Sequence, residues 1–172
     1  MDAPSPHDLL TVYLGDHLAG ASAGRARLAR AARAHAGTET GRVLADLHTE
    51  VVADRRELLR WMRALQVPRR RHLQVAARVV EALGALKPNG RLVRRSPLRT
   101  VVELEALLLG VEGKAAGWRS LRELAEAGGP AGSRLDARSA GTSFDVLLER
   151  AERQAARLEE LRRSAVRDVL AG

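Results

Sequence analysis

The segment 44–59, LADLHTEVVADRRELL, combines one histidine and four acids with apolar residues at helical spacing. Carboxylates and imidazole groups bind metal ions and are common in general acid-base catalysis. Only Asp54 falls on the apolar stripe of this helix, so we expect one inward acid on an otherwise mostly wet face. The segment therefore belongs either to a metal or catalytic centre inside a helical bundle, or to a solvated helix face with one buried polar residue.

His17 is a second polar residue on an otherwise apolar stripe. Counting outward from the turn near Gly37 places His17 and Asp54 within roughly one helical turn of the same level. Burying either side chain alone costs on the order of several kcal/mol, so an inward position demands a hydrogen-bonded or charged partner. We expect the two to form a satisfied polar pair that fixes helix register. A remnant ligand or metal site and a solvent-exposed position are the alternatives.

Two pairs of glutamates lie on later helices. Glu105 and Glu112 are seven residues apart and share one helix face. Glu149 and Glu152 share another at i,i+3 spacing. Carboxylates that face each other from two helices would hold a hard cation, or act as acid and base. The interpretation we favour is neutralisation in ordinary ion pairs by the cations Lys114, Arg119 and Arg153.

Composition excludes several classes of function. The chain of 172 residues has no cysteine, which excludes disulfides, thiolate metal sites, iron–sulfur clusters and cysteine nucleophiles. It also lacks the patterns G-x-x-x-x-G-K-S/T, G-x-G-x-x-G and H-E-x-x-H, so nucleotide binding has no support from a motif. No apolar run approaches the roughly 20 residues of a membrane helix. We expect a single domain over 1–172, soluble and cytoplasmic.

Positive charge is concentrated in one part of the chain. Residues 69–99 hold eight arginines and one lysine against one glutamate, so +9 − 1 = +8, which equals the net charge of the whole chain. We expect a solvated basic crossover here. A surface for nucleic acid or another polyanion and a docking site for an acidic protein are the alternatives. The arginines that would make such a polyanion site are Arg69, Arg70, Arg71, Arg94 and Arg95.

Helices would position all of these residues. The chain is rich in the helix formers Ala, Leu and Arg and poor in strand formers, and apolar residues recur at alternating three- and four-residue spacing. We predict an all-α fold with helices over 6–36, 39–66, 71–86, 97–127 and 144–169, and a flexible loop over 128–143. The long segment between the second and fourth helices lets the last pair start at the other end of the bundle.

This helix order carries a resemblance to a known family. The stretches YLGDHLAGASAG, LKPNGRL, SPLRTVVELEALLLGVEGKAAGWRSL and LLERAERQAARLEEL are similar to small, largely uncharacterised ferritin-like proteins of high-GC bacteria, over residues 9–165. The resemblance implies a ferritin-like four-helix bundle with a short fifth helix in the crossover. Ferritin-like di-iron centres use a carboxylate on each of two helices and a Glu-x-x-His pair on each of the other two.

The chain departs from that di-iron pattern. It contains no Glu-x-x-His, and the last two long predicted helices contain no histidine. We therefore predict a non-enzymatic helical-bundle protein without a cofactor, in a binding or structural role. The alternatives are a degenerate metal site that holds iron or manganese through carboxylates and His17, and polyanion binding through 69–99. The partner is left open among nucleic acid, an acidic protein and a second copy of the chain in a homodimer, and no membrane is expected.

Overall fold

The computed structural model describes residues 3–68, 98–135 and 141–171. Within these residues the regular elements are all helical and there is no strand, which confirms the all-α part of the prediction. The long helices are α1 (Pro6–Ala34), α2 (Glu39–Ala64), α4 (Arg99–Glu126) and α7 (Phe144–Leu170). The short elements are α5 (Gly129–Gly132) and the 3₁₀ turn η2 (Ser133–Leu135). The helix expected over 71–86 lies outside the described residues.

Local hydrogen bonds set the ends of α1 and α2. The Ser5 hydroxyl accepts a hydrogen bond from the Asp8 amide at 3.2 Å, so Ser5 caps α1 with Pro6 at the first helical position. After α1 the chain turns at Gly37, whose φ of +82° is a left-handed conformation that glycine adopts readily. The Thr38 hydroxyl then accepts from the Gly41 amide at 3.1 Å and caps α2. This short turn makes α1 and α2 antiparallel.

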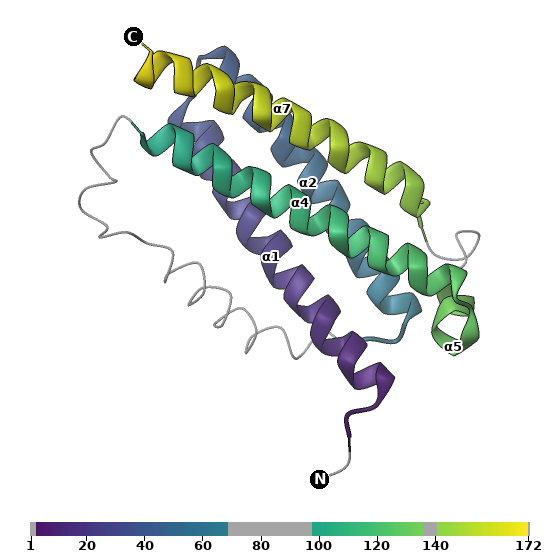
Figure 1. Ribbon diagram of the computed structural model, residues 1–172. Helices are drawn as coiled ribbons and strands as arrows, with labels where there is room; N and C mark the ends of the chain where they lie inside the picture. Colours follow the sequence, from purple (N-terminus) through teal and green to yellow (C-terminus); the bar gives the residue numbers. More distant parts are fainter. Residues whose placement is uncertain (1–2, 69–97, 136–140, 172) are drawn as a thin grey trace.

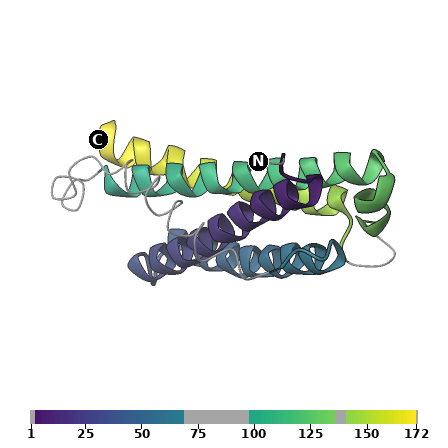
Figure 2. The same ribbon diagram turned by 90° about the horizontal axis from the view of Figure 1, so that it is seen from below.

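The four long helices lie side by side in two antiparallel pairs (Figure 1). The α1–α2 and α4–α7 contacts are the most extensive, and α1 also packs on α4 and α2 on α7. Figure 2 shows α1 running obliquely between the layer of α4 and α7 and the layer of α2. The end of α2 and the start of α4 lie at opposite ends of the four helices (Figure 1), so residues 69–97 connect these two ends.

Apolar stripes from all four long helices meet in one core. Every position of the stripe predicted for α2 is buried, and the same holds for most of the stripe of α4. Burying a large apolar side chain contributes about 1.5–3 kcal/mol, so this core supplies most of the favourable free energy of folding. The α2 stripe consists of Leu44, Leu47, Val51, Asp54, Leu58, Trp61 and Leu65.

The segment between α4 and α7 differs from the flexible loop expected over 128–143. Its first part forms α5 and η2, and the Leu135 side chain in η2 is buried in the core. Gly132 lies close to α4, because an added Cβ would stand 2.7 Å from the Leu124 carbonyl oxygen. The glycine-rich composition predicts a loop, whereas a single leucine with a place in the core organises part of it as helical turns.

Among residues 3–68, 98–135 and 141–171, no helix is both long enough and apolar enough to cross a bilayer.

Candidate functional site

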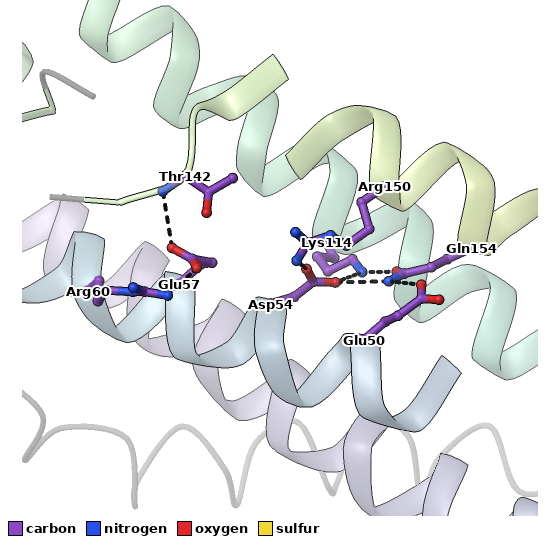
Figure 3. Close-up of polar contacts among 8 residues, drawn as sticks. All are labelled: Glu50, Asp54, Glu57, Arg60, Lys114, Thr142, Arg150 and Gln154. Atoms are coloured by element: carbon purple, nitrogen blue, oxygen red, sulfur yellow. Dashed lines mark hydrogen bonds and ion pairs between the residues drawn. The ribbon is translucent and has the colours of Figure 1, made fainter. Parts of the chain in front are cut away.

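Asp54 on α2 is the centre of a polar cluster inside the protein (Figure 3). Its side chain is 2% exposed, which confirms the prediction that this acid points inward. The Lys114 ammonium of α4 lies 2.5 Å from Oδ2, and the Arg150 guanidinium of α7 donates to Oδ1 at 2.9 Å. Three helices therefore meet at one carboxylate.

Gln154 on α7 connects this carboxylate to a second one. It is 0% exposed, and its carbonyl oxygen accepts a hydrogen bond from Lys114. Its Nε2 donates to Asp54 Oδ2 at 3.1 Å and to Glu50 Oε2 at 3.0 Å. Glu50 in turn accepts from Arg157 Nη1 at 2.7 Å. We call these six side chains the buried polar cluster: Glu50, Asp54, Lys114, Arg150, Gln154 and Arg157.

The buried polar cluster is nearly neutral. Its two carboxylates and three cations sum to −2 + 3 = +1. Asp46, 3.6 Å from Arg157 Nη2, brings the sum to zero. A charge inside a protein is tolerated when it is paired and when its remaining hydrogen-bonding capacity is satisfied. This balance explains how Asp54 is accommodated in the middle of an apolar stripe.

Lys114 is the most deeply placed cation of the buried polar cluster. Its side chain is 15% exposed and lies between Asp54 and the Gln154 carbonyl. Burial lowers the pKa of the Lys114 ammonium, and the neighbouring Asp54 carboxylate opposes that effect. The ammonium thus occupies the position between two oxygen ligands where a hard cation would otherwise bind.

The donor set does not fit a metal centre. Both oxygens of Asp54 accept hydrogen bonds from cationic side chains, and those of Glu50 are engaged by Gln154 and Arg157. In the described part of the chain, no group of three or more histidines and acids is arranged to hold a metal ion. Every oxygen of these two carboxylates therefore accepts a hydrogen bond from another side chain, and the arrangement can hold the three helices in register.

His17 does not pair with Asp54, so the expected partnership is wrong. Its ring packs edge-on against Tyr13, with centroids 4.6 Å apart, and lies over Gly117 on α4. Burial lowers the pKa of the His17 imidazole, and Asp16 opposes that effect. Counting from the turn gives the level of a residue along the helix but not its direction around the axis, which is why this prediction failed.

The four glutamates predicted as candidate ligands are exposed and do not gather around Asp54. Glu105 is 49% exposed, with Arg162 at 3.8 Å. Glu149 pairs with Arg153 at 2.9 Å, the ordinary ion pair that we favoured. Glu112 and Glu152 also lie on the outer surface. Lys114 forms its ion pair with Asp54 and not with these glutamates.

Glu57 is a second buried acid of the opening segment, where only one was expected. It is 5% exposed, pairs with Arg60, and accepts a hydrogen bond from the Thr142 amide at 3.3 Å. Glu57 therefore holds the residues that precede α7 against α2 (Figure 3). Glu57 lies three residues after Asp54 and four before Trp61, which places it on the inner face of α2. This spacing could have predicted its burial from the sequence.

Gln154 and Arg150 were also missed from the sequence. Gln154 lies three residues after Ala151 and four before Leu158, both of which are apolar and lie in the core. That spacing puts an amide on an apolar stripe, which is the same signal that identified Asp54. Arg150 lies at the edge of the stripe, and helical spacing alone does not say that its guanidinium reaches inward.

The stretch GASAG at 20–24 matches the pattern G-x-S-x-G of a hydrolase nucleophile motif. That motif works on a sharp turn between a strand and a helix, whereas this stretch lies in the middle of α1. The Ser22 hydroxyl donates to the Leu18 carbonyl at 2.8 Å and accepts from Arg55 Nε at 3.1 Å. It is a helix-packing serine and not an activated nucleophile.

The basic residues predicted as a polyanion site, Arg69, Arg70, Arg71, Arg94 and Arg95, lie outside the described residues. Comparison of the chain with known protein families, with curated proteins and with solved structures finds no match.

Proposed function

We propose that the protein is a non-enzymatic, ferritin-like helical bundle that acts through its surface, in a binding or structural role. Two antiparallel helix pairs, joined by a long connection from the end of α2 to the start of α4 at the opposite end of the four helices, support this architecture. The cysteine-free sequence fits a reducing compartment and supports a cytoplasmic location. In this proposal the buried polar cluster fixes which helix faces meet in the interior.

The observation that carries this proposal is the position of Lys114. In a ferritin-like metalloprotein, acids and histidines from four helices point inward and leave oxygen and nitrogen lone pairs for the metal. Here an ammonium and two guanidinium groups are paired with oxygens of the Asp54 and Glu50 carboxylates. A metal ion would have to displace Lys114 and leave a buried cation without its partner, which is strongly unfavourable.

Metal analysis tests the proposal. The protein is purified without chelators, and iron and manganese are measured per chain by mass spectrometry. We expect far less than one ion per chain, and the same amount in Asp54→Asn. Stoichiometric metal that disappears in Asp54→Asn and persists in the exposed control Glu105→Gln would overturn the proposal, because it would show a metal centre at the buried polar cluster.

A further inference from the structure

Charge is divided sharply along α2. Residues 39–54 carry four acids and one arginine, a sum of −4 + 1 = −3. Residues 55–66 carry four arginines and one acid, a sum of +4 − 1 = +3. Cations of α4 and α7 neutralise the acidic half through the buried polar cluster. Among the described residues, no acid of another helix is paired with Arg56, Arg60 or Arg63 of the basic half.

Three arginines of the basic half line one shallow depression. Arg56, Arg60 and Arg63 surround Leu59 on α2. Their spacing of four and three residues places them in a row about 10 Å long on one side of the helix. All three are exposed, so their guanidinium groups are available to a partner. We call this surface the arginine row.

Two members of the arginine row are held in place. Arg60 is paired with the buried Glu57 carboxylate, and its side chain remains 46% exposed. Arg63 Nε donates to the Leu59 carbonyl at 3.3 Å, which leaves its two terminal nitrogens to face outward. Within the described residues Arg56 has no hydrogen-bond or ion-pair partner. Guanidinium groups anchored at one nitrogen lose less conformational entropy when they bind an anion.

We propose that the arginine row binds the phosphate backbone of nucleic acid without reading its sequence. Guanidinium groups form paired hydrogen bonds with phosphate oxygens, and a row of them along a helix follows a linear array of phosphates. The described surface offers no exposed aromatic ring beside the row for base stacking, since Trp61 is fully buried. Contact is therefore limited to the backbone.

Charge density favours nucleic acid over the other anionic partners. A duplex presents one negative charge per roughly 1.7 Å and releases counterions on binding, so each arginine that neutralises a phosphate adds to the affinity. An acidic protein seldom reaches that density. A membrane surface would need an apolar helix face beside the basic one, whereas the apolar face of α2 is buried in the core. The inference rests on the proposed function, because it names the partner that the surface of the bundle would bind.

The test compares two triple variants by fluorescence anisotropy with a labelled duplex of mixed sequence. Arg56→Gln, Arg60→Gln and Arg63→Gln together remove the arginine row. The matched control replaces Arg25, Arg30 and Arg33 of α1, which are also exposed, and removes the same charge. Far-UV circular dichroism and thermal unfolding establish that both variants fold. Binding is measured over a series of salt concentrations.

We expect the arginine-row variant to lose affinity at least about tenfold at low salt and to lower the slope of log K against log salt by about 3, since each phosphate contact contributes about 0.9. The control should keep the wild-type slope. Equal losses in both variants, or no binding by the wild type at low salt, would overturn the inference. So would tighter binding to polyglutamate or to phosphatidylserine vesicles. Failure here leaves the metal content unchanged, so it is distinguishable from failure of the proposed function.

Discussion

At the scale of single residues, the interior of the protein is organised around charges that neutralise one another. Asp54 occupies a stripe position that an apolar residue would fill in a simpler core, and Lys114, Arg150 and Gln154 satisfy its oxygens. A buried ion pair adds little net stability compared with an apolar pair of similar shape, but removing one partner is costly. The buried polar cluster therefore specifies which faces of α2, α4 and α7 meet.

Replacing Lys114 by methionine tests this role. The variant keeps the length of the side chain and leaves the Asp54 carboxylate without its nearest cation. We expect the free energy of unfolding, measured in urea, to fall by about 3 kcal/mol. The loss should be clearly smaller in an Asp54→Asn background, because no buried charge is then left unpaired. Arg153→Met, which breaks the exposed pair with Glu149, should cost no more than about 1 kcal/mol; an equal loss there would contradict the argument.

The His17 imidazole gives a second prediction, on the pH dependence of stability. Because burial lowers its pKa in the folded state, the unfolded state binds the proton more tightly. The contribution of His17 is fully present above the unfolded pKa, about 6.5, and is lost as the pH falls from there toward the folded pKa. Unfolding by urea should show a steeper loss between neutral and mildly acidic pH in the wild type than in His17→Gln.

The other titrating groups do not obscure this comparison. The remaining histidines are present in both proteins, so the difference between the two pH profiles isolates His17. Hydrogen bonds from Arg162 and Arg163 lower the pKa of Glu159 to about 2, so its contribution is lost only below its ordinary value of 4.5. Parallel pH profiles for the wild type and His17→Gln would show that the His17 environment does not favour the neutral ring.

At the scale of elements, close helix approach occurs where α1 meets α4. An alanine Cβ at Gly117 would lie 2.9 Å from the His17 ring, whereas one at Gly113 on the same helix would meet no atom within 4 Å. A Cβ added at Gly20 or Gly24 of α1 would also meet no atom within 4 Å. The crossing therefore depends on the absence of a side chain at Gly117, beneath His17.

The two glycines of α4 form a matched pair of variants. Gly113→Ala should raise the free energy of unfolding by about 0.5–1 kcal/mol, because alanine is the better helix former and the site is open. Gly117→Ala should fail to stabilise, since the half-buried His17 ring must move. In a His17→Ala background, Gly117→Ala should become stabilising. Equal stabilisation by both single variants would contradict the close approach.

Much of the arrangement of elements could be predicted, because helical spacing reports burial directly. The inward position of Asp54 agrees with the structure, and the bounds of the four long helices agree with it to within a few residues. The partners of Asp54 could not be predicted, since Lys114, Arg150 and Gln154 lie on helices distant in sequence. Their contacts depend on helix rotation and long flexible stems, which periodicity does not encode.

At the scale of the whole molecule, the acidic and basic halves of α2 have different surroundings. The acidic half is bound into the interior by cations of the neighbouring helices, and the basic half carries the arginine row on the surface. The chain continues from there into 69–99, where the summed charge is again positive. In the function that we propose, the surface of the bundle is the place of interaction.

The effect of a divalent metal on thermal unfolding tests the central claim most directly, because any ligand that binds only the folded state raises the unfolding temperature. Chelator-treated protein is unfolded with and without a large excess of Mn²⁺ or anaerobic Fe²⁺, alongside Asp54→Asn. We predict an unchanged unfolding temperature in the wild type, since Lys114 and Arg150 already occupy the Asp54 carboxylate. Metal at about 100 times its Kd would add about 2.7 kcal/mol. A rise in unfolding temperature that Asp54→Asn abolishes would contradict the account.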